Sequence, residues 1–189
     1  MYALIMAGGR GTRLGQGEKA LARVLDKPLL SYVLAAVTDA GLDPVVITSP
    51  HTPYTANYCR IHDILWICTD GKGYVEDIRQ AITELSIKGP CLTICADLPG
   101  ITAEHIKIAR DTFEKSGFPA GSVWVPSPNG HAADTLPGIP VGMNILTGAL
   151  IDEEQNEIQI LISDPLLALN VNTPEDLADA ERLLSLKRM

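Results

Sequence analysis

Met-Ala-Gly-Gly-Arg-Gly-Thr-Arg-Leu-Gly-Gln-Gly-Glu-Lys, residues 6–19, is the stretch that says most about the fold of this chain. It directly follows the short apolar run 2–5, which has the length of a strand. Glycine adopts positive φ at little steric cost and lets the backbone approach a bulky anion. Three cations that suit phosphate oxygens stand among the glycines, namely Arg10, Arg13 and Lys19. A strand that leads into such a loop predicts a polyphosphate site at the carboxyl end of a sheet.

Two well-known phosphate-binding loops do not fit this stretch. A P-loop needs glycine, four residues and then Gly-Lys-Ser/Thr, and no position matches. A dinucleotide-binding loop needs Gly-x-Gly-x-x-Gly and an acidic residue after the second strand. Counted from Gly9 the sixth position is Leu14, and the second predicted strand ends on 48–50 without a carboxylate. A purely structural glycine turn would not need the cations, so we expect a nucleotide-binding loop of another kind.

Apolar strands and amphipathic helices alternate along the next hundred residues. Strands are predicted at 45–48, 64–68, 91–96 and 122–125. Helices are predicted at 29–37, 55–60, 75–85 and from an N-cap at Thr102 to about 115. This alternation predicts an α/β fold, a Rossmann-like three-layer α/β/α sandwich with a mostly parallel mixed sheet.

The pattern changes in the last third of the chain. Residues 126–140 hold four prolines and predict an excursion loop. Its His131 and Asp134 either contact a second substrate or are simply solvated. Further strands are predicted at 141–146, 158–162 and 167–171, and a last helix at 174–186 with proline in its first turn.

Length, charge and cysteine content limit the class of protein. The 189 residues predict a single domain, 1–189. The net charge of −8 argues against a nucleic-acid or anionic-membrane binder, because these need a basic surface. The sequence shows no leader and no apolar run of membrane-spanning length, so we expect a cytoplasmic protein. The cysteines lack the spacing of metal ligands and predict reduced core thiols: Cys59, Cys68, Cys91 and Cys95.

Asp97 follows a predicted strand of uncharged residues. The carboxyl ends of parallel strands meet in one crevice, so we expect Asp97 to face the phosphates. A carboxylate there would repel a triphosphate unless a cation stood between them, and Mg²⁺ is held by one or two carboxylates plus substrate phosphates. The alternative is a cap for the helix after Pro99, and the two roles are compatible. Either one of Asn170 and Asn172 completes the metal shell, or both serve local turn and cap chemistry.

A second glycine-rich turn, 69–74, precedes the helix at 75–85 and contains Asp70, Gly71 and Gly73. A free helix N-terminus binds anions, but acidic residues already occupy the first turn of this helix. We therefore expect this turn to recognise a base or ribose through backbone groups and carboxylates. A simple capped turn remains the alternative.

Gly142 and Asn144 lie within a predicted strand. A glycine in a strand indicates that something approaches the backbone closely, and we expect the second substrate to do so here. The chain offers no serine, cysteine or histidine constellation for nucleophilic catalysis. The nucleophile is therefore expected to belong to a substrate.

Residues 4–15 together with Glu18 and Lys19 resemble the signature of sugar-phosphate and cofactor nucleotidyltransferases, a group that includes the molybdenum-cofactor guanylyltransferases. The segments 69–77 and 141–144 are similar to those of the archaeal adenosylcobinamide-phosphate guanylyltransferases. The resemblance implies that GTP and adenosylcobinamide phosphate give adenosylcobinamide-GDP and pyrophosphate. The alternatives are transfer to the molybdenum cofactor or a sugar phosphate, and a non-catalytic nucleotide-binding regulator.

The resemblance also implies roles for individual residues. Arg13 and Lys19 would neutralise charge on the α-phosphate and the pyrophosphate, and Asp97 would hold Mg²⁺. Asn172 stands where the wider group places a second metal ligand, although it is not a carboxylate. Gly142 and Asn144 would meet the corrinoid phosphate. The nucleotide would contact the first loop and the second turn at Ala7, Gly8, Gly9, Arg10, Gly11, Thr12, Asp70, Gly71 and Gly73. No nucleic acid is expected as a partner, and a homodimer is left open.

Overall fold

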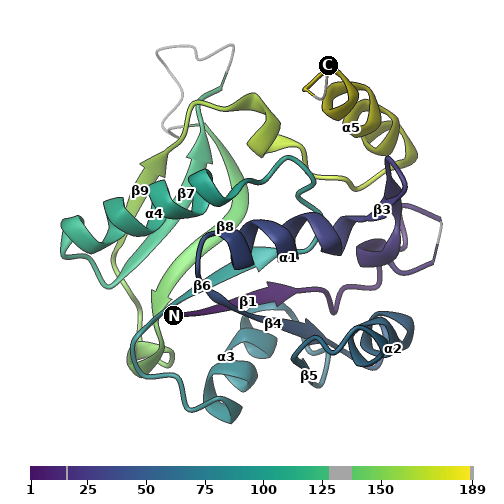
Figure 1. Cartoon of the computed structure of the whole chain (residues 1–189). Coiled ribbons are helices and arrows are strands. Elements are labelled where there is room, and N and C mark those ends of the chain that lie inside the picture. The colour runs from purple at the N-terminus through teal and green to yellow at the C-terminus, as the bar shows by residue number, and fades with distance from the viewer. Residues whose placement is uncertain (16, 128–137, 188–189) are drawn as a thin grey trace.

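The structure, a computed structural model, describes residues 1–15, 17–127 and 138–187. Its main feature is a seven-stranded sheet in the order β5-β4-β1-β6-β8-β7-β9 (Figure 1). β8 runs antiparallel to β6 and β7, whereas the other pairs are parallel. The strands are β1 (Tyr2–Met6), β4 (Asp43–Thr48), β5 (Trp66–Cys68), β6 (Pro90–Cys95), β7 (Ala120–Val125), β8 (Ile139–Thr147) and β9 (Glu157–Leu161).

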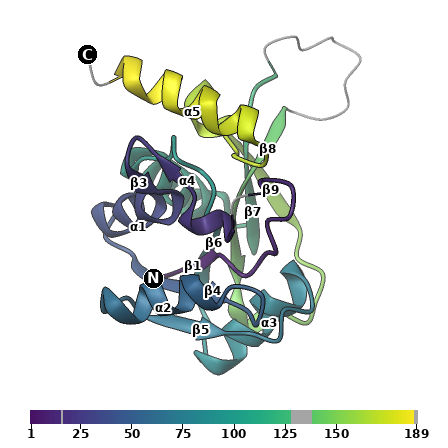
Figure 2. The same cartoon turned by 90° about the vertical axis from the view of Figure 1, so that its right-hand side faces the viewer.

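Helices cover both faces of this sheet. On one face lie α1 (Leu29–Asp39) and α4 (Ala103–Ser116), and on the other lies α3 (Tyr74–Glu84) (Figure 2). Two helices lie at the periphery, α2 (Pro53–Ile61) beside β4 and β5, and α5 (Pro174–Lys187). The mixed sheet between helical layers confirms the predicted α/β/α architecture.

The central strand β1 is apolar on both faces because both are covered. Ile5 packs with the α1 and α4 side, and Leu4 packs with the α3 side; both are fully buried. Met6 pairs with Ile47 of β4 and Cys95 of β6. The loops that follow these three strands therefore leave the sheet at one edge, where the site is built.

The predicted secondary structure differs from the observed one in two places. The strand predicted at 167–171 is wrong: a 3-10 helix, η3 (Pro165–Ala168), stands there, and the Asp164 carboxylate caps it by accepting from Leu166 N–H. The sequence also gave no sign of the small hairpin of β2 (Arg23–Val24) and β3 (Lys27–Pro28). Its turn uses Leu25 and Asp26 at positive φ rather than Asn-Gly.

The cysteines are free, as predicted. Cys59 and Cys91 are buried, but Cys68 is exposed because it ends the edge strand β5, so the prediction of a core position is wrong for that residue. His131 and Asp134 lie outside the described residues. Within the described part of the chain, no helix is both long and apolar enough to cross a membrane.

Candidate active site

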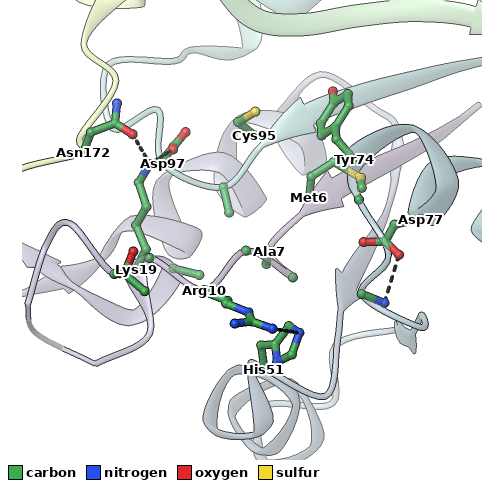
Figure 3. Close-up of a pocket in the computed structure, with 18 of the residues that line it drawn as sticks. Met6, Ala7, Arg10, Lys19, His51, Tyr74, Asp77, Cys95, Asp97 and Asn172 are labelled. Carbon is green, nitrogen blue, oxygen red and sulfur yellow. Dashed lines mark hydrogen bonds and ion pairs between the residues drawn. The ribbon is translucent and has the colours of Figure 1, made fainter.

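A pocket of about 480 Å³ opens at the carboxyl edge of β1, β4 and β6 (Figure 3). Most of the residues proposed from the sequence line it: Ala7, Gly8, Gly9, Arg10, Gly11, Thr12, Arg13, Lys19, Gly71, Gly73, Asp97 and Asn172. These residues come from segments far apart in the chain. The structure therefore gathers the first loop, the second turn, the end of β6 and the residues before α5 around one space.

Three proposed residues are not part of this lining. Asp70 is exposed and accepts a hydrogen bond from Lys72 Nζ at 2.7 Å, and it does not line the pocket. Gly142 and Asn144 lie on β8, beyond Cys95 of the pocket wall.

Sequence reasoning missed several lining residues: Met6, Ala20, His51, Tyr74, Asp77, Cys95 and Ala96. His51 follows β4 at the same sheet edge as the first loop, and that position was a usable signal.

The segment after β4 contacts the glycine-rich loop and supports it. Ser49 Oγ donates to the carbonyl oxygen of Gly8 at 2.7 Å, at the start of the loop. The guanidinium of Arg10 lies 3.3 Å from Nε2 of His51. Gly11 has a φ of +57°, and a Cβ there would lie 2.9 Å from Cβ of Lys19. The loop thus folds back on the lysine, which requires glycine at position 11.

Glu18 fixes the far end of the loop by capping α2. Its Oε1 accepts from Tyr54 N–H at 2.7 Å, and its Oε2 accepts from Thr55 N–H and Thr55 Oγ1, each at 2.6 Å. The first N–H groups of a helix have no partner inside the helix, and the side chain of the N-cap residue Thr52 does not cap them. A carboxylate also suits the positive end of the helix dipole. The charge of Glu18 is therefore directed at α2, away from Lys19.

Lys19 points the opposite way, into the pocket. Its Nζ forms an ion pair with Oδ2 of Asp97 and donates to Oδ1 of Asn172 at 2.8 Å. The guanidinium of Arg13 donates to the same Asn172 oxygen at 3.2 Å. The side chains of Lys19 and Asp97 are only 19% and 12% exposed. Two cations from the first loop thus converge on the ends of β6 and the segment before α5.

Asn172 is held in one orientation by its neighbours. Its Nδ2 donates to Oδ1 of Asn170 at 2.9 Å, which leaves its own Oδ1 facing the cations. Its backbone N–H donates to Oδ2 of Asp176 at 2.8 Å, and Thr173 N–H donates to the same oxygen at 2.9 Å. Burial raises the pKa of Asp176, but these hydrogen bonds and the charge of Lys19 outweigh it and lower the pKa below its usual value.

The donor set at Asp97 fits a magnesium ion shared with a substrate. Oδ1 of Asp97 is buried and has no hydrogen-bond partner among the described residues. The same described residues contain no cluster of three or more His, Cys, Asp or Glu that would hold a metal unaided. Mg²⁺ commonly takes one or two carboxylates and completes its shell with water and phosphate oxygens. Asp97 does not cap the next helix, because Thr102 is the N-cap of α4.

The second turn forms the opposite wall. Gly71 has a φ of +69°, and its N–H donates to Oδ1 of the buried Asp77 at 3.1 Å. The phenol of Tyr74 hydrogen bonds to Oγ1 of Thr93 at 3.4 Å and also to Asn144. Burial of this phenol is the main cause that raises the pKa of Tyr74. The carboxylate of Asp77 therefore holds the shape of the turn. The backbone of the turn borders the pocket.

Comparisons with known proteins show which family and which solved fold the chain is similar to. A family model described as "MobA-like NTP transferase domain" matches residues 3–182. The chain is 34% identical to the adenosylcobinamide-phosphate guanylyltransferase of Methanocaldococcus jannaschii over 97% of both chains. It is 28% identical to the bifunctional protein GlmU of Shouchella clausii, but spans only 39% of that protein.

A solved structure described as a hypothetical transferase from Thermus thermophilus is 18% identical. It superposes with a TM-score of 0.69 over 93% of this chain and 98% of the other. At this identity the superposition shows a shared fold.

Proposed function

The chain belongs to the MobA-like NTP transferase family, and on that premise we propose that it transfers GMP from GTP to adenosylcobinamide phosphate, with release of pyrophosphate. One observation carries the proposal: Lys19 and Arg13 converge with Asp97 and Asn172 at the carboxyl edge of the sheet. That arrangement suits a polyphosphate and an accompanying cation. The choice of GTP and of the corrinoid acceptor is supported by the likeness to the guanylyltransferase of M. jannaschii.

The reaction needs positioning and charge neutralisation rather than a protein nucleophile. An oxygen of the acceptor phosphate attacks the α-phosphorus of GTP, the bond to the bridging oxygen of the β-phosphate breaks, and pyrophosphate leaves. Phosphoryl-type transfers of this kind depend on alignment and on cations placed where charge develops. We assign to Lys19 and Arg13 the neutralisation of charge on the α-phosphate and the leaving pyrophosphate.

Asp97 would hold a magnesium ion, and Asn172 would be a second ligand once Lys19 and Arg13 release its oxygen. Such an ion would supply additional neutralisation of phosphate charge. We expect Mg²⁺ to tighten GTP binding in the parent protein and to tighten it far less in the variant Asp97→Ala. Calorimetric titration with GTP, with and without Mg²⁺, measures both effects. An identical response of parent and variant would remove the metal-ligand role.

At the other end of the nucleotide, the turn of Gly71 and Gly73 borders the pocket with backbone groups. We assign the base or ribose to this turn, with Asp77 fixing its shape. His51 stands between the turn and the first loop, since it contacts Arg10 and lies beside Gly71.

The test is acceptor-dependent release of pyrophosphate. The protein is incubated with each of the four NTPs, alone and with adenosylcobinamide phosphate, a sugar 1-phosphate or molybdopterin. We expect release only with GTP and the corrinoid phosphate. Release with a different acceptor would identify another nucleotidyltransferase, and no acceptor-dependent release with any NTP would indicate a nucleotide-binding regulator.

A further inference from the structure

The sheet is not covered equally on its two faces. In Figure 2, α1 and α4 lie on one side of β7, β8 and β9, whereas α3 lies on the other side near β1 and β4. The hydrophobic core between α3 and the sheet accordingly contains Leu4, Val45 and Cys91, which lie in the half of the sheet away from β9. On the α3 side of β7, β8 and β9, Ser122 is buried and Leu146 packs against this core, but Trp124, Pro140 and Leu161 are half-buried or exposed.

Three apolar side chains form a row across this face. Trp124 pairs in register with Pro140 of β8 on one side and with Leu161 of β9 on the other. Val123 and Val125 belong to the core under α4, so Trp124 between them points to the opposite face. Leu161 is 53% exposed, Pro140 is exposed and Trp124 is half-buried. We call these three residues the apolar row.

The position of the indole is fixed by a short chain of hydrogen bonds. Nε1 of Trp124 donates to Oγ of Ser122 at 2.8 Å, and that hydroxyl donates to Oε1 of Glu157 at 2.9 Å. Ser122 also pairs in register with Asn144 of β8 and Gln159 of β9. The apolar row is therefore bordered on the same face by side chains with amide and carboxylate groups.

The apolar row lies next to the nucleotide pocket. Cys95 lines the pocket, and a Cβ on Gly142 would lie 2.9 Å from its Sγ, so the two residues are in close contact across β6 and β8. Gly142 has a φ of +74° and is followed toward the row by Pro140 on the same strand. Neighbouring strands are about 4.8 Å apart, which places the strand of Trp124 roughly 10 Å from that of Cys95.

We propose that the apolar row is the platform on which the corrin macrocycle of the acceptor lies. The inference rests on the proposed function and names the place of its second substrate. The acceptor phosphate must reach the α-phosphorus inside the pocket, but a pocket of about 480 Å³ that holds a nucleotide has no room for a macrocycle. The ring must therefore lie on a surface next to the pocket, and the row provides an aromatic and aliphatic one. Gln159 is exposed and is the amide side chain available to the amide groups at the rim of the ring, whereas Asn144 is bound to the phenol of Tyr74.

The experiment compares Leu161→Glu with Leu65→Glu. Leu65 is 56% exposed and lies just before β5, at the opposite edge of the sheet, so it is a matched control. Both changes put a charge at an exposed position, and both variants are expected to fold. We expect Leu161→Glu to raise the KM for adenosylcobinamide phosphate by about tenfold or more, because it replaces apolar contact with a charge. The KM for GTP should stay unchanged in both variants.

A second variant guards against an effect of charge alone. Trp124→Phe keeps an aromatic ring and should raise the acceptor KM less than Trp124→Ala, with calorimetry showing equal GTP binding in both. An acceptor KM in Leu161→Glu equal to that of the parent would overturn the inference. If Leu161→Glu leaves that KM unchanged and also lowers the oligomeric order in ultracentrifugation, the row is an interface between copies of the chain instead. If the parent shows no acceptor-dependent turnover, the proposed function fails first and the inference fails with it.

Discussion

Lys19 joins parts of the chain that are distant in sequence, because its ammonium group contacts both Asp97 and Asn172. The adjacent Glu18 does not neutralise it, since that carboxylate is bound to the first turn of α2. Neighbouring residues of opposite charge thus serve different partners. This separation leaves the lysine available to exchange its protein oxygens for those of a triphosphate.

We expect Lys19→Ala to lower kcat by about 10²–10³-fold, the loss typical when one preorganised group that stabilises transition-state charge is removed. Lys88→Ala is the control, because Lys88 is exposed and lies before the amino end of β6, away from the pocket. Steady-state pyrophosphate release measures the effect, and thermal unfolding checks that the variant folds. Near-normal turnover would remove Lys19 from the mechanism.

The thiols should differ strongly in reactivity, because the thiolate is the reacting form. Burial raises the pKa of Cys59 to about 11, and burial raises the pKa of Cys91 and Cys95 to about 12. At pH 8 these three thiols are almost fully protonated, and burial also limits access of the reagent to Cys59 and Cys91. Cys68 is exposed, so the reagent can reach it. We expect iodoacetamide to modify Cys68 first, as measured by peptide mass mapping over time. Modification of Cys91 at the same rate as Cys68 would contradict the burial seen in the structure.

At the scale of elements, the segment from β4 into α2 holds the first loop at both ends. Ser49 binds the carbonyl oxygen of Gly8, and Glu18 binds the amides of Tyr54 and Thr55. The loop is therefore anchored where it leaves β1 and again where it delivers Lys19. An anchored loop loses less conformational freedom when the nucleotide binds.

Glu18→Ala removes the second anchor. We expect a loss of about 1 kcal/mol in the free energy of unfolding, the usual value of a helix cap. We also expect a fall in kcat/KM for GTP of about 10²-fold, because small displacements of a catalytic group are costly. Ala56→Gly is the matched control: it weakens the same helix by about 1 kcal/mol and leaves the carboxylate in place.

The effect of Glu18→Ala should vanish when Lys19 is already alanine, if the anchor acts through the lysine. A double-mutant cycle on kcat/KM measures this coupling. Additive losses would mean that Glu18 stabilises the fold without positioning Lys19. Urea unfolding of the same variants separates the two contributions.

Element by element, the sequence predicted what depends on periodicity and missed what depends on tertiary contacts. The strands and helices of the βαβ part carry strong apolar patterns, and the structure confirms them. The apolar run 167–171 is buried as expected at Leu167 and Val171, but the Asp164 cap makes its start helical. No local pattern could show that Glu18 caps a distant helix, since its partners are 36 and 37 residues away.

The candidate site was predictable for a related reason. Gly8 and Asp97 follow strands whose carboxyl ends must meet in a parallel sheet, so topology alone brings them together. Lys19 lies at the far end of the loop and reaches them because the loop folds back at Gly11. Tyr74 and Asp77 were missed as pocket residues because they belong to a helix, where their direction depends on how α3 packs. His51 stands at a strand end and could have been found by the same rule.

At the scale of the whole molecule, the sheet separates two tasks. Its parallel half, β5-β4-β1-β6, carries at its carboxyl edge the pocket that we propose for the nucleotide. Its other half contains the antiparallel strand β8 and presents the apolar row beside that pocket. In the proposed function, the two substrates would therefore meet at the α-phosphorus from the two halves of one sheet.

The central claim is that the GMP unit of GTP passes to a corrinoid phosphate. The most direct measurement is the fate of a radiolabel in GTP during incubation with adenosylcobinamide phosphate and Mg²⁺, followed by chromatography and mass spectrometry of the corrinoid. We predict that label at the α-phosphate appears in the corrinoid and that label at the γ-phosphate appears in pyrophosphate. Label from the γ-phosphate in the corrinoid, or no label in the corrinoid from either position, would contradict the account.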